Sequence, residues 1–183
     1  FGVALALTIE AALGSNPWTV FHEGAAARLG LSIGSLVILT GALLLILAIP
    51  LKEPIGLGTI LNVMVIGVAV DITLAVVPDL DRMVWRVLAL AVSPIVLGLA
   101  SGLYIGAGLG PGPRDGLMTA LERRGMNVST ARTLIEVTAL AVGWLLGGTV
   151  GVGTVYFAAT IGFWVRFFLA KLRIDAVVAP DAT

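Results

Sequence analysis

The sequence LGSNP at residues 13–17 and the sequence LGPGP at residues 109–113 are two copies of one Gly/Pro-rich stretch. Each is followed by a segment too short to cross a bilayer as a helix. When the chain is aligned with itself at a shift of about 95 residues, three further landmarks coincide in the same order. These are Gly30 with Gly125, residues 56–59 (GLGT) with 151–154 (GVGT), and Gly67 with Gly162. The chain is therefore predicted to contain two copies of one structural unit.

The composition indicates a membrane protein. Of the 183 residues, 58% are hydrophobic and only 12% are charged, whereas about a quarter of the residues of a soluble domain are charged. The formal net charge is zero, which argues against nucleic acid as a partner. Because the chain has no cysteine and one histidine, His22, we expect no metal centre and no cofactor. No catalytic motif is present, and we expect no enzyme activity.

Five segments are apolar over about the 20 residues that a transmembrane helix needs. They are residues 33–50, 57–77, 83–109, 128–147 and 152–172. A sixth segment, residues 1–13, is shorter, and the repeat alignment predicts that its helix begins upstream of Phe1. The sequence thus predicts an all-α membrane protein with six transmembrane helices.

The two Gly/Pro-rich stretches are each predicted to lead into a short, broken helix. Asn16 is a favourable N-cap and Pro17 a favourable first helical residue, and Pro113 repeats this pattern in the second copy. About a dozen residues form a helix of about 18 Å, which is half a bilayer. Each unit is therefore predicted to hold three membrane crossings and one half helix.

An odd number of crossings per unit implies that the second unit enters the membrane from the opposite side, as an inverted repeat. The predicted division is a first repeat at residues 1–78, with its first helix truncated, a second repeat at 79–174 and a polar tail at 175–183. Basic residues favour the cytoplasmic side, and they divide six to three. The larger group is Lys52, Arg114, Arg123, Arg124, Lys171 and Arg173, and the smaller is Arg28, Arg82 and Arg86. Both termini are then expected on the cytoplasmic side.

Several motifs resemble the bacterial YczE/YitT-type family of multi-pass membrane proteins. They are residues 13–24 (LGSNPWTVFHEG), 103–119 (LYIGAGLGPGPRDGLMT), 132–137 (RTLIEV) and 147–154 (GGTVGVGT). The resemblance extends over nearly the whole chain, apart from the absent start of the first helix. It implies a multi-pass protein of the inner membrane of a bacterium, and it carries no substrate or catalytic residue over to this chain.

The N-termini of the two half helices are the predicted binding site. Each carries free N–H groups and partial positive charge, and the repeat symmetry can bring both ends together near the midplane. The residues expected there are Asn16, Gly112, Arg114, Asp115 and Thr119. Arg114→Ala is predicted to abolish activity and leave the fold intact. The alternative is that the loops are interfacial turns and the short helices lie flat on the membrane surface.

Charged residues in apolar segments are costly, and they are usually functional or paired. His22, Glu23 and Glu10 are candidates for proton coupling. Arg132 and Glu136, four residues apart, are predicted to form a structural ion pair. Asp71 and Arg166 occupy equivalent positions of the two repeats and are candidates for a second pair. Asn62 and Thr73 are candidates to line a polar path, and Gly98, Gly102 and Gly106 are predicted to form a seam for close helix packing.

The inverted repeat and the paired broken helices favour a small transporter, or permease, for a small polar or anionic solute. One alternative is a passive channel with aquaporin-like half helices. Another is a non-transporting assembly factor or partner subunit, which would hold no solute. The expected partners are the lipid bilayer and the solute. Six short spans enclose little volume, which is compatible with a homodimer.

Overall fold

The computed structural model describes residues 1–51, 56–106 and 112–172, and within these residues it contains eight α-helices and no β-strand. The helices are α1 (Gly2–Ala11), α2 (Pro17–Leu29), α3 (Ile33–Ala48), α4 (Leu57–Val76), α5 (Met83–Gly106), α6 (Pro113–Glu122), α7 (Val128–Leu146) and α8 (Val152–Leu172). The predicted all-α class is confirmed. The predicted tail at residues 175–183 lies outside the described residues.

Both short helices begin and end at residues that suit those positions. Asn16 is the N-cap of α2, where its side chain accepts a hydrogen bond from the helix backbone, and Pro17 is the first helical residue. Helix α6 begins at Pro113. Gly30 and Gly125 follow the two helices with φ of 66° and 92°, a conformation that glycine adopts at little cost. The predicted N-cap and N-terminal prolines are confirmed.

Three helices, α4, α5 and α8, are long and apolar enough to cross a membrane. Helices α2 and α3 together would provide a fourth span, bent by 111° at the break between them. Helix α3 alone has 16 residues, and α1 is an apolar helix of 10 residues. Helix α7 has 19 residues but carries Arg132 and Glu136. Length and hydropathy thus identify fewer spans in the described residues than the six predicted.

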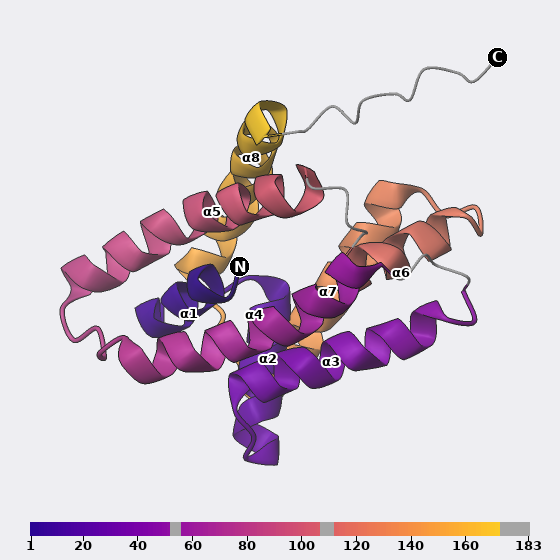
Figure 1. The fold of residues 1–183 in the computed structure, drawn as a ribbon. Coiled ribbons are helices and arrows are strands. Elements are labelled where there is room, and N and C mark those ends of the chain that lie inside the picture. Colours follow the sequence, from indigo (N-terminus) through magenta and orange to yellow (C-terminus); the bar gives the residue numbers. More distant parts are fainter. Residues whose placement is uncertain (52–55, 107–111, 173–183) are drawn as a thin grey trace.

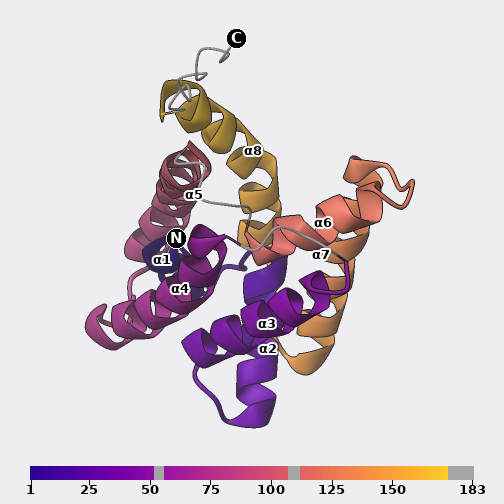
Figure 2. The same cartoon turned by 45° about the vertical axis from the view of Figure 1, so that its right-hand side comes forward.

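The helices fall into two groups, which lie side by side in Figures 1 and 2. In the first bundle, α1 packs against α4 and α5, and α5 packs against α8. In the second bundle, α2 packs against α3 and α7, and α6 packs against α3 and α7. Each bundle therefore combines helices from both halves of the sequence.

Each bundle has its own apolar core. One cluster joins Ala4, Leu5, Val70, Leu97 and Phe157, all from the first bundle. Another joins Ala25, Ala26 and Leu36 from the second bundle. Many large apolar side chains instead face outward, with Val76, Leu145 and Val152 at least 75% exposed. An apolar outer surface of this kind is compatible with contact to lipid and not with contact to water.

Glycine allows close contact within the first bundle. A Cβ atom at Gly98 would lie 2.6 Å from the Trp164 Cβ, and one at Gly102 would lie 2.9 Å from the Phe168 Cβ. Both contacts join α5 to α8. The predicted glycine seam is confirmed at these two positions, because only a small residue permits the two helix backbones to approach this closely.

The most extensive contact between the bundles is that of α3 with α4. Gly34 and Gly67 meet there backbone to backbone, and a Cβ at Gly67 would lie 2.5 Å from the Gly34 carbonyl oxygen. Asp71 on α4 accepts hydrogen bonds from the Gly34 N–H at 2.7 Å and the Ser32 hydroxyl at 2.6 Å. In the described residues, α7 and α8 form no contact of similar extent. The helices of the α3–α4 hairpin are therefore packed together, whereas those of the equivalent α7–α8 hairpin are not.

Candidate functional site: a cavity between the two bundles

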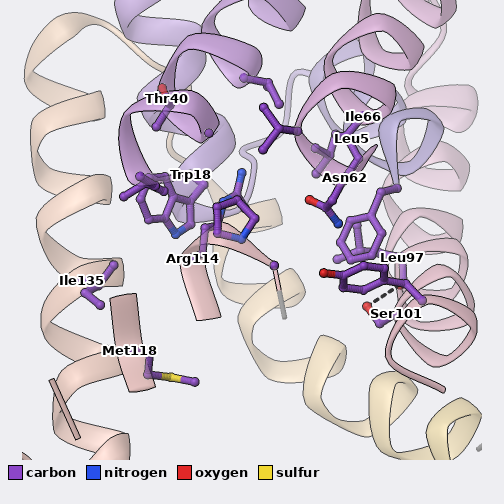
Figure 3. Close-up of a pocket in the computed structure, with 18 of the residues that line it drawn as sticks. Leu5, Trp18, Thr40, Asn62, Ile66, Leu97, Ser101, Arg114, Met118 and Ile135 are labelled. Carbon is purple, nitrogen blue, oxygen red and sulfur yellow. Dashed lines mark hydrogen bonds between the residues drawn. The ribbon is translucent and has the colours of Figure 1, made fainter. Parts of the chain in front are cut away.

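A cavity of about 260 Å³ lies between the two bundles, and every one of the eight helices contributes to its wall. Most of the lining side chains are apolar, for example Leu5, Ile66, Leu97 and Ile135 (Figure 3). The lining polar and aromatic side chains are Trp18, His22, Thr40, Asn62, Ser101, Tyr104, Arg114, Arg132 and Glu136. Polar groups gathered inside a protein with an apolar exterior mark the cavity as the candidate site.

Arg114 and Trp18 meet at one side of the cavity (Figure 3). The guanidinium carbon of Arg114 lies 4.7 Å from the centroid of the Trp18 ring, which is cation–π geometry. Each residue directly follows the proline that begins its short helix. The N-terminal ends of α2 and α6 therefore meet at the cavity, although they are 96 residues apart in the chain.

His22 is one of the buried polar residues of the site. It is 1% exposed, and its Nε2 has no hydrogen-bond partner. Its ring lies against Trp18 and Phe21, with centroids 6.3 and 5.6 Å away. A buried nitrogen without a partner costs free energy that a hydrogen bond would recover. Because His22 lines the cavity, a polar group inside the cavity can supply that bond.

Thr40 and Asn62 bring further polar groups from α3 and α4. Figure 3 shows Asn62 extending into the cavity on the side opposite Trp18 and Arg114. Ser101, by contrast, donates its hydroxyl hydrogen to the Leu97 carbonyl at 2.8 Å. The second polar position suggested by the sequence, Thr73, donates to the Ala69 carbonyl at 2.6 Å and does not line the cavity.

Arg132 and Glu136 line the cavity from α7. The Arg132 Nε and a Glu136 carboxylate oxygen are 3.0 Å apart, so the two side chains form the ion pair expected from their spacing. The side chains are 63% and 40% exposed, respectively. An exposed pair of this kind contributes little to stability, but it neutralises charge at this part of the wall.

The five residues predicted to bind a substrate have different surroundings. Gly112 and Arg114 line the cavity. Asn16 does not: its oxygen accepts from the Thr19 N–H at 3.0 Å and its amide donates to the Thr19 hydroxyl at 2.8 Å. The side chains of Asp115 and Thr119 lie outside the described part of the chain. The structure therefore gives Asn16 a capping role.

Of the three candidates for proton coupling, His22 lines the cavity, and Glu23 and Glu10 do not. Glu23 accepts hydrogen bonds from the Ser15 hydroxyl at 2.9 Å and the Thr149 N–H at 2.8 Å. The Ser15 N–H also donates to the Thr149 carbonyl, at 3.3 Å. Glu23 thus ties the first Gly/Pro-rich loop to the loop between α7 and α8.

Asp71 and Arg166, the second pair suggested by the repeat, have separate partners. Asp71 binds the start of α3 through Ser32 and Gly34. Arg166 donates from Nε to the Gly162 carbonyl one turn earlier in α8, at 3.2 Å. The equivalent positions carry different roles because α3 packs on α4 and α7 does not pack comparably on α8.

Sequence reasoning passed over Trp18, Thr40, Ser101 and Tyr104 as parts of the site. A signal existed only for Trp18, because the loop alignment makes it the counterpart of Arg114. The other three are ordinary residues within apolar helices, and only the packing brings them to one cavity.

Long apolar helices, an apolar exterior and an internal cavity with polar groups define an integral membrane protein. The chain belongs to the family of unknown function DUF6198, which matches residues 1–170. Together with the membrane protein YczE described next, this match confirms the family resemblance and the membrane character seen in the sequence.

Three relatives match almost all of the chain. An uncharacterized protein of Haemophilus influenzae is 36% identical over 169 residues, which cover 92% of this chain and 78% of the relative. The uncharacterized membrane protein YczE of Bacillus subtilis is 36% identical over 174 residues, covering 93% and 80%. The uncharacterized protein YyaS of Bacillus subtilis is 26% identical over 175 residues, covering 91% and 86%. No solved structure matches the chain.

Proposed function

We propose that this protein is a small transporter that carries a small polar or anionic solute across the bacterial cytoplasmic membrane. It works as two inverted repeats, and the solute binds in the cavity between the bundles. The observation that carries the proposal is the asymmetry of the two hairpins: α3 is packed against α4, and α7 stands apart from α8.

Helix contacts support a two-fold relation between the repeats. The shift of about 95 residues relates α1, α2, α3 and α4 to α5, α6, α7 and α8, respectively. Exchanging these labels converts the contact of α1 with α4 into that of α5 with α8. It likewise converts α2 with α7 into α6 with α3, and α2 with α3 into α6 with α7. A two-fold axis between the repeats requires such an exchange.

Individual hydrogen bonds follow the same exchange. The Arg28 Nε donates to the Leu146 carbonyl at 3.2 Å, and Arg123 donates to the Leu51 carbonyl at 3.4 Å. A shift of 95 residues relates both the two arginines and the two leucines. The first bond satisfies the carbonyl of the last residue of α7, and the second a carbonyl shortly after the end of α3.

The α3–α4 contact has no counterpart between α7 and α8. The positions equivalent to Gly34 and Gly67 are Ser129 and Gly162. A Cβ at Gly162 would meet only the Arg166 side chain, 3.9 Å away. In transporters built from inverted repeats, one bundle rocks against the other around a fixed site. We infer that the second state is the exchanged one, with α7 packed on α8 and α3 separated from α4.

The distribution of basic residues gives the proposed orientation. Without Arg114, which lines the cavity, the division is five to three, from Lys52, Arg123, Arg124, Lys171 and Arg173 against Arg28, Arg82 and Arg86. The larger group belongs on the cytoplasmic side, together with both termini. The packed ends of α3 and α4 then face outward, so the described state is closed to the outside.

The test is disulfide trapping of the second state in the full-length protein in liposomes. The sequence has no cysteine, so Ser129→Cys with Gly162→Cys introduces one pair of thiols. We expect loss of free thiols on mild oxidation, together with loss of solute counterflow, and recovery of both on reduction. Val137→Cys with Val155→Cys, two exposed positions on the same helices, is the control pair and should stay reduced.

Flux measurements separate the proposal from its alternatives. A carrier gives saturable flux that is accelerated by solute on the opposite side. Flux without saturation or acceleration, in a protein that never forms the Ser129–Gly162 crosslink, would identify a passive channel. No flux of any solute, with a second protein co-purifying in fixed ratio, would identify a partner subunit and overturn the transporter.

A further inference from the structure

We propose that the solute is a small neutral carboxamide or lactam, held by hydrogen bonds to Asn62, Thr40 and His22. This inference rests on the proposed transport function and narrows its substrate class. The three side chains come from α4, α3 and α2, respectively, and all of them line the cavity. A solute bound to all three would therefore contact both bundles.

These three side chains have no hydrogen-bond partner within the described part of the chain. The His22 Nε2 is buried and unpaired, and neither the Thr40 hydroxyl nor the Asn62 amide takes part in a hydrogen bond there. By contrast, hydroxyl groups of other helix residues donate to the carbonyl three or four residues earlier, as in Thr8, Thr73, Ser93, Ser101 and Thr160. Because an unpaired polar group in an apolar interior costs free energy, three of them around one cavity point to a polar ligand.

The three side chains offer no charge to a solute. A charged imidazole at His22 would be costly, because the residue is 1% exposed and lies against aromatic rings. Of the charged residues in the described wall, Arg132 and Glu136 pair with each other at 3.0 Å, and Arg114 already has partners in the chain. An ionic solute would therefore lose hydration at the three side chains without gaining an opposite charge from them.

The pattern of donors and acceptors favours a carboxamide. The Asn62 amide, which extends into the cavity (Figure 3), holds a donor beside an acceptor, and the Thr40 hydroxyl can act as either. An asparagine amide forms two hydrogen bonds with a group of the same arrangement, as it does with adenine. Carboxamides and lactams have this arrangement. A carboxylate only accepts and an ammonium only donates, so each would leave one half of the Asn62 amide unpaired.

The rest of the wall limits the polarity and the size of the solute. Leu5, Val37, Ile66 and Leu97 line the cavity from four different helices. Their side chains offer no hydrogen bond, so a sugar would keep unpaired hydroxyl groups there. The volume of about 260 Å³ is below the usual range of about 300–1,000 Å³ for drug-sized ligands. A short alkyl or aromatic body with one amide group fits both limits.

The test measures how tightly the purified full-length protein binds butyramide and compounds of similar size. Butyrate replaces the amide nitrogen by an oxygen, methyl propyl ketone replaces it by a methyl group, and butylamine lacks the carbonyl. Thermal stabilisation and titration calorimetry at neutral pH give the affinities. We expect butyramide to bind at least about 10-fold more tightly than each of the others, because every replacement leaves a buried donor or acceptor unpaired.

Two substitutions test the side chains themselves. Asn62→Leu removes the amide at similar volume and should weaken butyramide about 10-fold or more. Thr40→Val keeps the shape of the side chain and should weaken it about 3-fold or more. Thr73→Val is the matched control and should leave the affinity unchanged. Thr73 lies on α4 with Asn62, but it donates to its own helix and does not line the cavity.

Equal affinity for butyrate, the ketone or butylamine would overturn the substrate class and leave the transporter standing. So would a butyramide affinity that is unchanged in Asn62→Leu or, should that variant fail to fold, in Thr40→Val. If no compound of the panel binds but the Ser129–Gly162 crosslink forms, this inference alone fails. If none binds and the crosslink never forms, the proposed function fails with it.

Discussion

Arg114 covers the ring of Trp18 at 4.7 Å, and the two residues occupy the same position of the two repeats. A contact between equivalent positions must lie close to the axis that relates them. Both residues line the cavity, so in the proposed inverted repeat the starts of α2 and α6 would lie beside the axis. Solute binding there would affect both repeats at once, which is what an exchange of the two hairpin states requires.

The axial contact predicts that exchanging the two residues is tolerated. Trp18→Leu and Arg114→Gln should each lower the free energy of unfolding, and the coupling in a double-mutant cycle should be about 1–2 kcal/mol. The doubly exchanged protein, Trp18→Arg with Arg114→Trp, should recover most of this loss. Reversible unfolding in detergent measures each term. If the doubly exchanged protein loses as much free energy of unfolding as its two single substitutions together, the contact does not lie near the axis.

The asymmetric hairpins predict opposite effects at two equivalent glycines. Gly67→Ala brings a Cβ to within 2.5 Å of the Gly34 carbonyl oxygen and should destabilise the protein by about 1–3 kcal/mol. A Cβ in Gly162→Ala would contact only the Arg166 side chain, at an ordinary 3.9 Å, so the variant should be neutral, or stabilised by up to about 1 kcal/mol through helix propensity. Thermal unfolding of the two variants under the same conditions measures the difference. Equal destabilisation would mean that α7 and α8 are packed in solution.

Ser129→Leu is predicted to abolish transport without destabilising the protein. Ser129 is exposed in the described state, so a larger side chain should change the free energy of unfolding by no more than about 0.5 kcal/mol. In the exchanged state the same side chain would collide with α8 at Gly162. Counterflow in liposomes should therefore be lost, while the thermal unfolding of the variant stays the same as that of the unsubstituted protein. Full activity in this variant would contradict an approach of α7 to α8 during transport.

Glu23→Gln is predicted to act on stability and not on coupling. Its carboxylate joins Ser15 to Thr149, and replacing one oxygen by an amide leaves one of these donors facing an N–H group. The expected loss is about 1–3 kcal/mol. The pH dependence of solute flux should match the unsubstituted protein, because Glu23 does not line the cavity. A variant of normal stability whose flux no longer depends on pH would assign proton coupling to Glu23.

The sequence alone determined the class of the protein and the places where its helices begin. Apolar composition over a stretch of about 20 residues is a local property, and so are the N-cap at Asn16 and the prolines at positions 17 and 113. The repeat also follows directly, since it needs only an alignment of the chain with itself. The apolar helices, the N-cap and the N-terminal prolines are confirmed in the structure because no distant residue is needed to produce them, and the repeat stays a prediction.

Only the tertiary structure decided which side chains meet. Asp71 binds Gly34 and not Arg166, Asn16 caps its own helix, and Glu23 holds a loop that begins more than 120 residues later. The partner of a charged side chain depends on which helices pack together, and two repeats of nearly the same pattern can pack differently. The close approach at Gly34 and Gly67, with its open counterpart at Gly162, arises from packing between helices, which the periodicity of a single helix does not encode.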